Sequence, residues 1–185
     1  GYAESNPVLD TGGFDAKYKL LILLAHAFGV VCRPDDIVNF GIGNLGDLEL
    51  NYAREKGLKI KLVAHALKTA EGQVQCLVMP KFVGPGSKLF TVDDVYNGVI
   101  TKTSFADIQF FVGKGAGAHP TASAVLSDLS ALTYSYRYEY KKLHQNIRAS
   151  LSGDFGVRIL LRHPRTLRPL LEPYFSSTEA GFTNR

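Results

Sequence analysis

The first 19 residues concentrate acidic and basic side chains that could act together on a small polar molecule. Three carboxylates, Glu4, Asp10 and Asp15, precede Lys19, which follows Asp15 by four residues. In a helix, that spacing places Asp15 and Lys19 on one face. The carboxylates could then hold an ammonium group while the lysine moves a proton. The same spacing also fits an exposed ion pair worth only a few tenths of a kcal/mol, and spacing alone leaves both interpretations open.

A second candidate is the hexapeptide "GIGNLG", Gly41–Gly46, which matches the Gly-x-Gly-x-x-Gly pattern of dinucleotide-binding loops. Its surroundings argue against a cofactor site. Asp47 and Glu49 would occupy the helical turn whose N–H groups receive a pyrophosphate, and carboxylates there repel an anion. The ribose-binding acid expected about 20 residues further on is absent until Glu71. We therefore interpret Gly41–Gly46 as a glycine-rich turn that caps a helix.

Hydrophobic periodicity and turn residues predict the elements that must position these groups. Helices are expected at residues 14–28, 47–56 and 119–132, and strands at residues 58–67, 73–82, 95–102, 107–112, 134–140 and 156–162. The strands are separated by connections of hairpin length. The sequence therefore favours an α+β fold with a mostly antiparallel or mixed sheet over a doubly wound parallel sheet.

The first predicted helix, "FDAKYKLLILLAHAF", has one polar side carrying Asp15, Lys17 and Lys19 and is otherwise apolar. A helix of this composition is expected to be buried over most of its surface, with Gly29 as its C-terminal cap.

Near the C-terminus, "YSYRYEY" places four tyrosines at period two, which predicts a strand with an aromatic ladder on one face.

Composition narrows the class of protein. The net charge of +4 is small and the basic residues are scattered, which argues against nucleic-acid binding. Cys32 and Cys76 lie in apolar surroundings and are expected to be buried free thiols, as in a reducing cytoplasmic compartment.

No metal-ligand spacing is present, and the apolar run at residues 20–31 is too short to span a bilayer. His26 and His65 are flanked by apolar residues and are expected in the core or the sheet.

Two long motifs resemble homoserine dehydrogenases. The opening "GYAESNPVLDTGGFDAKYKLLIL" is similar to the start of that family's catalytic domain, which runs G-Y-x-E, a proline-containing link, D-x-x-G-x-D and a lysine four residues on. The segment "GKGAGAHPTASAVLSDL" is similar to the family's G-x-G-A-G…P-T-A-S-A-V…D-L pattern, and "YAREKGLKIKLVAHA" is similar to its helix–turn–strand segment. The resemblance covers roughly residues 1–132. In place of the family's histidine-proline-leucine turn, this chain has "GPGSKLF".

The resemblance implies roles for particular residues. Glu4 and Asp15 would contact the amino-acid substrate, Asp10 would line the same pocket, and Lys19 would donate and accept the proton. In the nicotinamide-binding part, Gly1 and the loop residues Gly115, Ala116 and Gly117 would approach the nucleotide. The reaction would be the NAD(P)-dependent interconversion of L-homoserine and L-aspartate 4-semialdehyde, in threonine and methionine biosynthesis. Hydride transfer to a carbonyl carbon requires a proton on its oxygen, which a lysine ammonium can supply.

The resemblance also implies an architecture. Residues 1–132 would form a catalytic and dimerisation domain like the C-terminal domain of glyceraldehyde-3-phosphate dehydrogenase, a mixed sheet with helices on one face. Residues 133–185 would form a C-terminal extension. The family's Rossmann domain is not among these 185 residues, so we expect a fragment of a longer enzyme that is inactive alone. Within residues 58–67, apolar side chains stand at both odd and even positions, so both faces of this strand are expected to be buried. One of these faces would be covered by a second subunit, which predicts a homodimer through the sheet.

Two alternatives stay open. The chain could be a non-catalytic oligomerisation or amino-acid-binding module that kept the fold, although the full set of acids and Lys19 argues against this. It could also belong to a related semialdehyde or sugar-phosphate dehydrogenase that uses a cysteine nucleophile. Neither Cys32 nor Cys76 has an evident histidine partner, which ranks this alternative last.

Overall fold

A computed structural model describes residues 7–145 and 149–175 of the chain. The chain forms two compact units, Gly1–Ser152 and Gly153–Arg185, each described here by itself. The predicted boundary after Leu132 stays a prediction. Gly1 and Glu4 lie outside the described residues.

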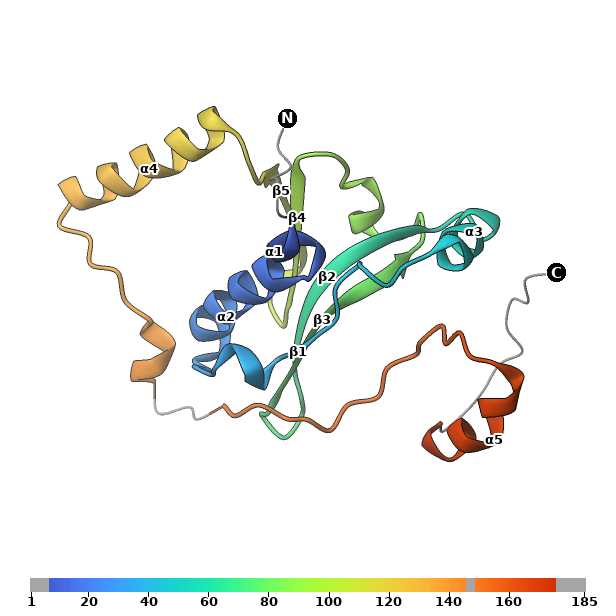
Figure 1. Ribbon diagram of the computed structural model, residues 1–185. Helices are drawn as coiled ribbons and strands as arrows, with labels where there is room; N and C mark the ends of the chain where they lie inside the picture. Colours follow the sequence, from blue (N-terminus) through green and yellow to red (C-terminus); the bar gives the residue numbers. More distant parts are fainter. Residues whose placement is uncertain (1–6, 146–148, 176–185) are drawn as a thin grey trace. The chain divides into compact units, whose positions relative to one another are not determined.

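The centre of the first unit is a three-stranded mixed sheet of order β1-β3-β2 (Figure 1). The long hairpin of β2 (Lys59–Lys68) and β3 (Val74–Val83) is antiparallel, with Ala64 opposite Val78. The short β1 (Val38–Asn39) pairs with β3 in parallel. The predicted α+β class and mixed sheet are therefore confirmed. β4 (Tyr96–Thr103) and β5 (Asp107–Lys114) form a separate antiparallel hairpin.

Helix α2 (Phe14–Phe28) packs against β2 and β3 and supplies much of the core. Leu20 and Leu24 are buried against Val74 and Val78 of β3. The helix ends at Gly29, whose φ of 69° is left-handed, so the predicted glycine cap is confirmed.

Two expectations for α2 were wrong. Tyr18, Ile22 and Leu23 are each about half exposed, because only one side of α2 meets the sheet. Lys17, expected on the polar side, lies on the buried side, where only 6% of its surface is exposed.

Two of the remaining helices lie where the sequence predicts them, at residues 47–55 and 118–133, whereas the short helix at residues 8–11 was not among the expected elements. The helices are α1 (Val8–Thr11), α3 (Asp47–Glu55) and α4 (Ala118–Thr133), with α5 (Arg168–Leu171) in the second unit. Short 3-10 turns occur at Pro34–Asp36, Lys88–Thr91, Lys141–His144, Arg165–Leu167 and Glu172–Tyr174. Among the described residues, no helix is long and apolar enough to cross a membrane.

The segment at residues 134–140 is not a strand, which corrects the prediction of a tyrosine ladder. The rings of Tyr138 and Tyr140 instead pack on His26, at centroid distances of 5.3 and 4.7 Å. A period-two pattern forms a strand only where another strand offers hydrogen bonds, and no strand in the described part of the chain does so here. His26 is consequently exposed on α2 beside these rings, not in the core, whereas His65 lies on β2 as expected.

Residues 156–162 are also not a strand. Leu151, which precedes this segment, instead reaches the sheet and forms a parallel bridge with Val74. Ala149 and Leu151 pack against the core, so residues beyond Leu132 help to close the first unit.

Candidate active site

Of the acidic and basic residues of the N-terminal motif, Asp15 and Lys19 pair at the start of α2, shortly after α1. Asp15 lies in the first turn of α2, and its Oδ2 is 2.7 Å from Nζ of Lys19. Both side chains are about half exposed, so the pair is open to solvent and to a ligand. Asp10 is exposed in α1, and its carbonyl oxygen accepts a hydrogen bond from the N–H of Gly13. The structure therefore brings Asp15 and Lys19 together and ties the Asp10 segment to the start of their helix.

Two glycines make this junction tight. Gly13 has a φ of 76°, a left-handed conformation that favours glycine. At Gly12, a Cβ atom would lie 2.5 Å from the ring of Phe14, so the Phe14 ring rests directly on the backbone. Asn39 of β1 donates from Nδ2 to the carbonyl oxygen of Gly12 at 2.9 Å. The sheet thus fixes the turn that precedes Asp15.

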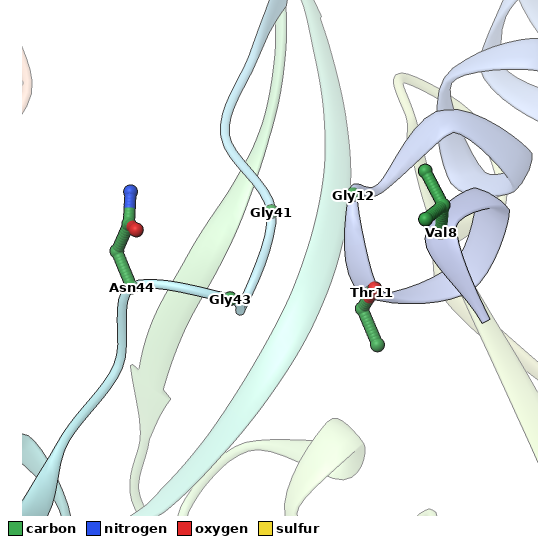
Figure 2. A pocket seen from close by; sticks show the side chains of 6 residues that line it. All are labelled: Val8, Thr11, Gly12, Gly41, Gly43 and Asn44. Atoms are coloured by element: carbon green, nitrogen blue, oxygen red, sulfur yellow. The ribbon is translucent and has the colours of Figure 1, made fainter. Parts of the chain in front are cut away.

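The "GIGNLG" loop packs on the same junction (Figure 2). The N–H of Ile42 donates to the carbonyl oxygen of Thr11 at 2.7 Å, and a Cβ at Gly41 would lie 2.2 Å from that oxygen. A shallow pocket of about 230 Å³ lies between the two segments, lined by Val8, Thr11, Gly12, Gly41, Gly43 and Asn44. Sequence reasoning did not find this role of Gly41, because the contact joins segments distant in the chain.

The far end of that loop starts α3 as predicted. The N–H of Gly46 donates to Oε2 of Glu49 at 2.8 Å, so the carboxylate satisfies a free N–H at the helix start. The interpretation of Gly41–Gly46 as a turn that caps a helix is confirmed.

The loop that joins β5 to α4 carries Gly115, Ala116 and Gly117. Gly117 precedes α4 with a φ of 121°, which requires glycine. At Gly115, a Cβ would lie 2.1 Å from Nδ2 of Asn97, so this glycine makes room for the Asn97 carboxamide. Asn97 was not found by sequence reasoning, since a lone asparagine carries no motif. Within the described ranges, no hydrogen bond or ion pair links this loop to Asp10, Asp15 or Lys19.

The cysteines are poorly suited to nucleophilic catalysis. Burial raises the pKa of the Cys76 thiol to about 11, with a smaller contribution from Cys32. Burial also raises the pKa of Cys32, and the charge of Asp36 adds to the effect. Both thiols are free, Cys76 buried and Cys32 partly buried. Because the thiolate is the reactive form, these surroundings argue against the cysteine-dependent alternative.

A separate charged cluster joins the central sheet to the segment before β4. Asp93 accepts from Nζ of Lys59 at 2.6 Å and from Nζ of Lys61 at 2.7 Å. These hydrogen bonds lower the pKa of Asp93. No group of three or more potential metal ligands occurs in the part of the chain that the structure describes.

Comparison with known proteins gives a consistent result. The family model described as homoserine dehydrogenase matches residues 1–130. A homoserine dehydrogenase of Lactococcus lactis is 36% identical over 129 residues, which are 70% of this chain and 30% of that protein. The enzyme of Neisseria gonorrhoeae is 37% identical, over 70% of this chain and 29% of its own length. The chain thus spans about 30% of the length of these curated relatives.

Solved structures agree. A crystal structure of a homoserine dehydrogenase from Thiobacillus denitrificans is similar with a TM-score of 0.66 and 34% identity, over 78% of this chain and 31% of that one. A hyperthermophilic archaeal homoserine dehydrogenase in complex with NADPH is similar with a TM-score of 0.56 and 25% identity, over 72% of this chain and 37% of that one. The similarity therefore extends over most of the first unit in both sequence and fold.

Proposed function

Because this chain belongs to the homoserine dehydrogenase family, we propose that its full-length protein interconverts L-homoserine and L-aspartate 4-semialdehyde with NAD(P). The observation that carries this proposal is the 2.7 Å pair of Asp15 and Lys19 at the start of α2, within the segment that the family model matches. The role would lie in threonine and methionine biosynthesis. The free thiols fit a reducing compartment, and we propose the cytoplasm.

Lys19 is proposed as the proton donor and acceptor. In the reducing direction its ammonium donates a proton to the aldehyde oxygen, so that no full negative charge develops there. In the oxidising direction the neutral amine takes the proton of the homoserine hydroxyl. Asp15 orients the amine through the 2.7 Å contact, and solvent exposure of both groups leaves room for the substrate. Together with Glu4 and Asp10, Asp15 would bind the substrate ammonium.

The nicotinamide nucleotide would supply or accept the hydride. Gly1 and the loop Gly115–Gly117 are proposed to lie against it, while a nucleotide-binding domain outside these 185 residues holds most of the molecule. The loop fits such a group, since Gly117 has a φ of 121° and no side chain to obstruct a flat ring. The related archaeal enzyme is described in complex with NADPH.

A homodimer through the sheet is proposed as well. Val63 and Met79 are opposite each other on β2 and β3, on the face away from α2, with Leu67 on the same side. Leu67 is 52% exposed, so an apolar strip is available to a second copy. Light scattering at micromolar concentration is expected to give the mass of a dimer, and a monomeric mass would contradict the proposal.

The catalytic proposal is tested by steady-state kinetics of the full-length protein with L-homoserine and NAD(P). Wild type is expected to turn over, and Lys19→Ala should lower kcat by roughly 10²- to 10⁴-fold with the fold intact. Lys102→Ala is the matched control, since Lys102 is exposed on β4. Near-normal kcat in Lys19→Ala would refute the role of Lys19 in proton transfer, and no turnover by wild type would favour the non-catalytic module of the same fold. The 185-residue chain by itself is expected to be inactive.

A further inference from the structure

We propose that Asn39 of β1 is a positioning residue that holds α1 and α2 at one angle, an inference that rests on the proposed function. The two helices carry acidic residues of the proposed substrate site, Asp10 on α1 and Asp15 on α2. Asn39 acts on the segment between the helices. It thereby sets where Asp10 lies relative to Asp15 and Lys19.

The joint between α1 and α2 consists of two glycines. α1 ends at Thr11 and α2 begins at Phe14, so Gly12 and Gly13 alone connect the helices. Glycine has more accessible backbone conformations than any other residue, and Gly13 adopts a left-handed one with a φ of 76°. Because two such residues specify the angle of the joint only weakly, contacts from outside the joint are needed to fix it.

Asn39 contacts both glycines of the joint, one with each end of its carboxamide. Its Nδ2 donates to the carbonyl oxygen of Gly12 at 2.9 Å. Its Oδ1 lies 2.8 Å from the position that a Cβ on Gly13 would take, so this oxygen rests against the Gly13 backbone. The carboxamide therefore spans the joint, and it fits there because residue 13 has no side chain.

Asn39 is itself fixed by the core of the sheet. It is the register partner of Val78 on β3, and the N–H of Phe40 donates to the carbonyl oxygen of Val78 at 2.8 Å. Val78 is fully buried, in the same hydrophobic cluster as Leu24 of α2. Through Asn39, the joint is therefore tied to the hydrophobic core of the first unit.

The hydrogen bonding of Asn39 is incomplete, which indicates a role other than stability. Its Oδ1 is buried and has no hydrogen-bond partner among the residues that the structure describes. The cost of such an unpaired oxygen is comparable to what the Nδ2 hydrogen bond contributes, so the side chain adds little net stability. The carboxamide does provide a contact with each glycine of the joint.

The joint affects one part of the proposed site and not the other. The 2.7 Å contact between Asp15 and Lys19 lies within one helix and does not depend on the joint. The position of Asp10 does depend on it, because the joint separates Asp10 from Asp15. Loss of the Asn39 contacts is therefore expected to weaken substrate binding more than proton transfer.

Steady-state kinetics of the full-length protein test this difference. Asn39→Leu keeps the branched shape of the side chain and removes both polar atoms. It is expected to raise KM for L-homoserine roughly 3- to 10-fold, the loss of one hydrogen bond, with kcat within about twofold of wild type and KM for NAD(P) unchanged. Asn39→Asp keeps the size but cannot donate to Gly12, so it should also raise KM. It replaces Asn39→Leu in the test if that variant folds poorly.

Val74→Ala is the control for lost stability. Val74 is buried in the core at the first position of β3, four residues before Val78. Its substitution should lower the melting temperature and leave KM for L-homoserine unchanged. An unchanged KM in Asn39→Leu, or an equal rise of KM in Val74→Ala, would overturn the positioning role.

Hydrogen–deuterium exchange gives a readout independent of turnover. The N–H of Gly13 donates to the carbonyl oxygen of Asp10 at 3.0 Å, so exchange at residues 8–17 reports on the joint. Asn39→Leu should speed exchange there without changing it at residues 20–28, an effect that Val74→Ala should not reproduce. Equal exchange in Asn39→Leu and wild type would overturn the proposal. Faster exchange at the joint without any turnover by wild type would refute the proposed function and support the Asn39 contacts.

Discussion

Gly41→Ala should separate the two interpretations of the "GIGNLG" loop. The new Cβ would lie 2.2 Å from the carbonyl oxygen of Thr11 and 2.7 Å from Cα of Gly12. Both are backbone atoms, so the loop or α1 must move, and the 2.7 Å hydrogen bond from Ile42 to Thr11 is strained or lost. Overpacking of this kind costs about 1–3 kcal/mol, and the hydrogen bond adds about 0.5–1.5 kcal/mol.

Gly43→Ala is the matched control in the same loop. A Cβ at Gly43 meets nothing within 4 Å, so this substitution should change the free energy of unfolding by less than about 0.5 kcal/mol. Urea denaturation of the full-length protein measures both variants. Gly41→Ala should also raise KM for L-homoserine, because the displaced segment carries Asp10.

A dinucleotide-binding loop would give a different pattern. The first and second glycines of Gly-x-Gly-x-x-Gly would then both be needed, and Gly43→Ala would weaken NAD(P) binding. Equal destabilisation by the two substitutions, or a loss of nucleotide affinity confined to Gly43→Ala, would refute the packing argument.

Three further predictions concern other charged or reactive groups. Lys19→Met should lower kcat in both reaction directions by roughly 10²-fold or more while circular dichroism stays unchanged, and a retained kcat would refute its role in proton transfer. With a pKa of about 11, Cys76 should react slowly with a disulfide reagent near pH 8, and Cys76→Ala should remain active; rapid labelling of the folded protein would contradict its burial. The pKa of Asp93 is lowered by Lys59 and Lys61, so its contribution to stability is present at neutral pH and lost as the pH falls below about 4. The stability difference between wild type and Asp93→Asn, measured by urea denaturation, should therefore shrink on acidification, and a constant difference would count against these ion pairs.

The sequence predicts those elements whose pattern is complete within one segment. The apolar run of α2, its Gly29 cap and the β2–β3 hairpin are visible in this way. The Asp15–Lys19 pair is likewise local, since a helix alone places residues four apart on one face. The assignment of chemistry to that pair came from the family resemblance, because an i,i+4 ion pair is common on helices.

Features that depend on distant segments were not predictable. The tyrosines at residues 134–140 have the period of a strand, but no strand among the described residues pairs with them, and Tyr138 and Tyr140 pack on His26 instead. A Cβ at Gly41 would collide with the carbonyl oxygen of Thr11, and a Cβ at Gly115 would collide with the Asn97 carboxamide. Both contacts join segments that only the fold brings together. The burial of Lys17 also depends on which side of α2 meets the sheet, which a helix with apolar residues nearly all round does not specify.

The central claim is hydride transfer between a nicotinamide nucleotide and C4 of a four-carbon amino acid. The most direct test incubates the full-length protein with L-aspartate 4-semialdehyde and NADPH or NADH carrying deuterium at the transferred position. Mass spectrometry and NMR of the product are predicted to show L-homoserine with one deuterium at C4, formed in wild type and strongly reduced in Lys19→Ala. No homoserine with either nucleotide, or homoserine without deuterium at C4, would contradict the account.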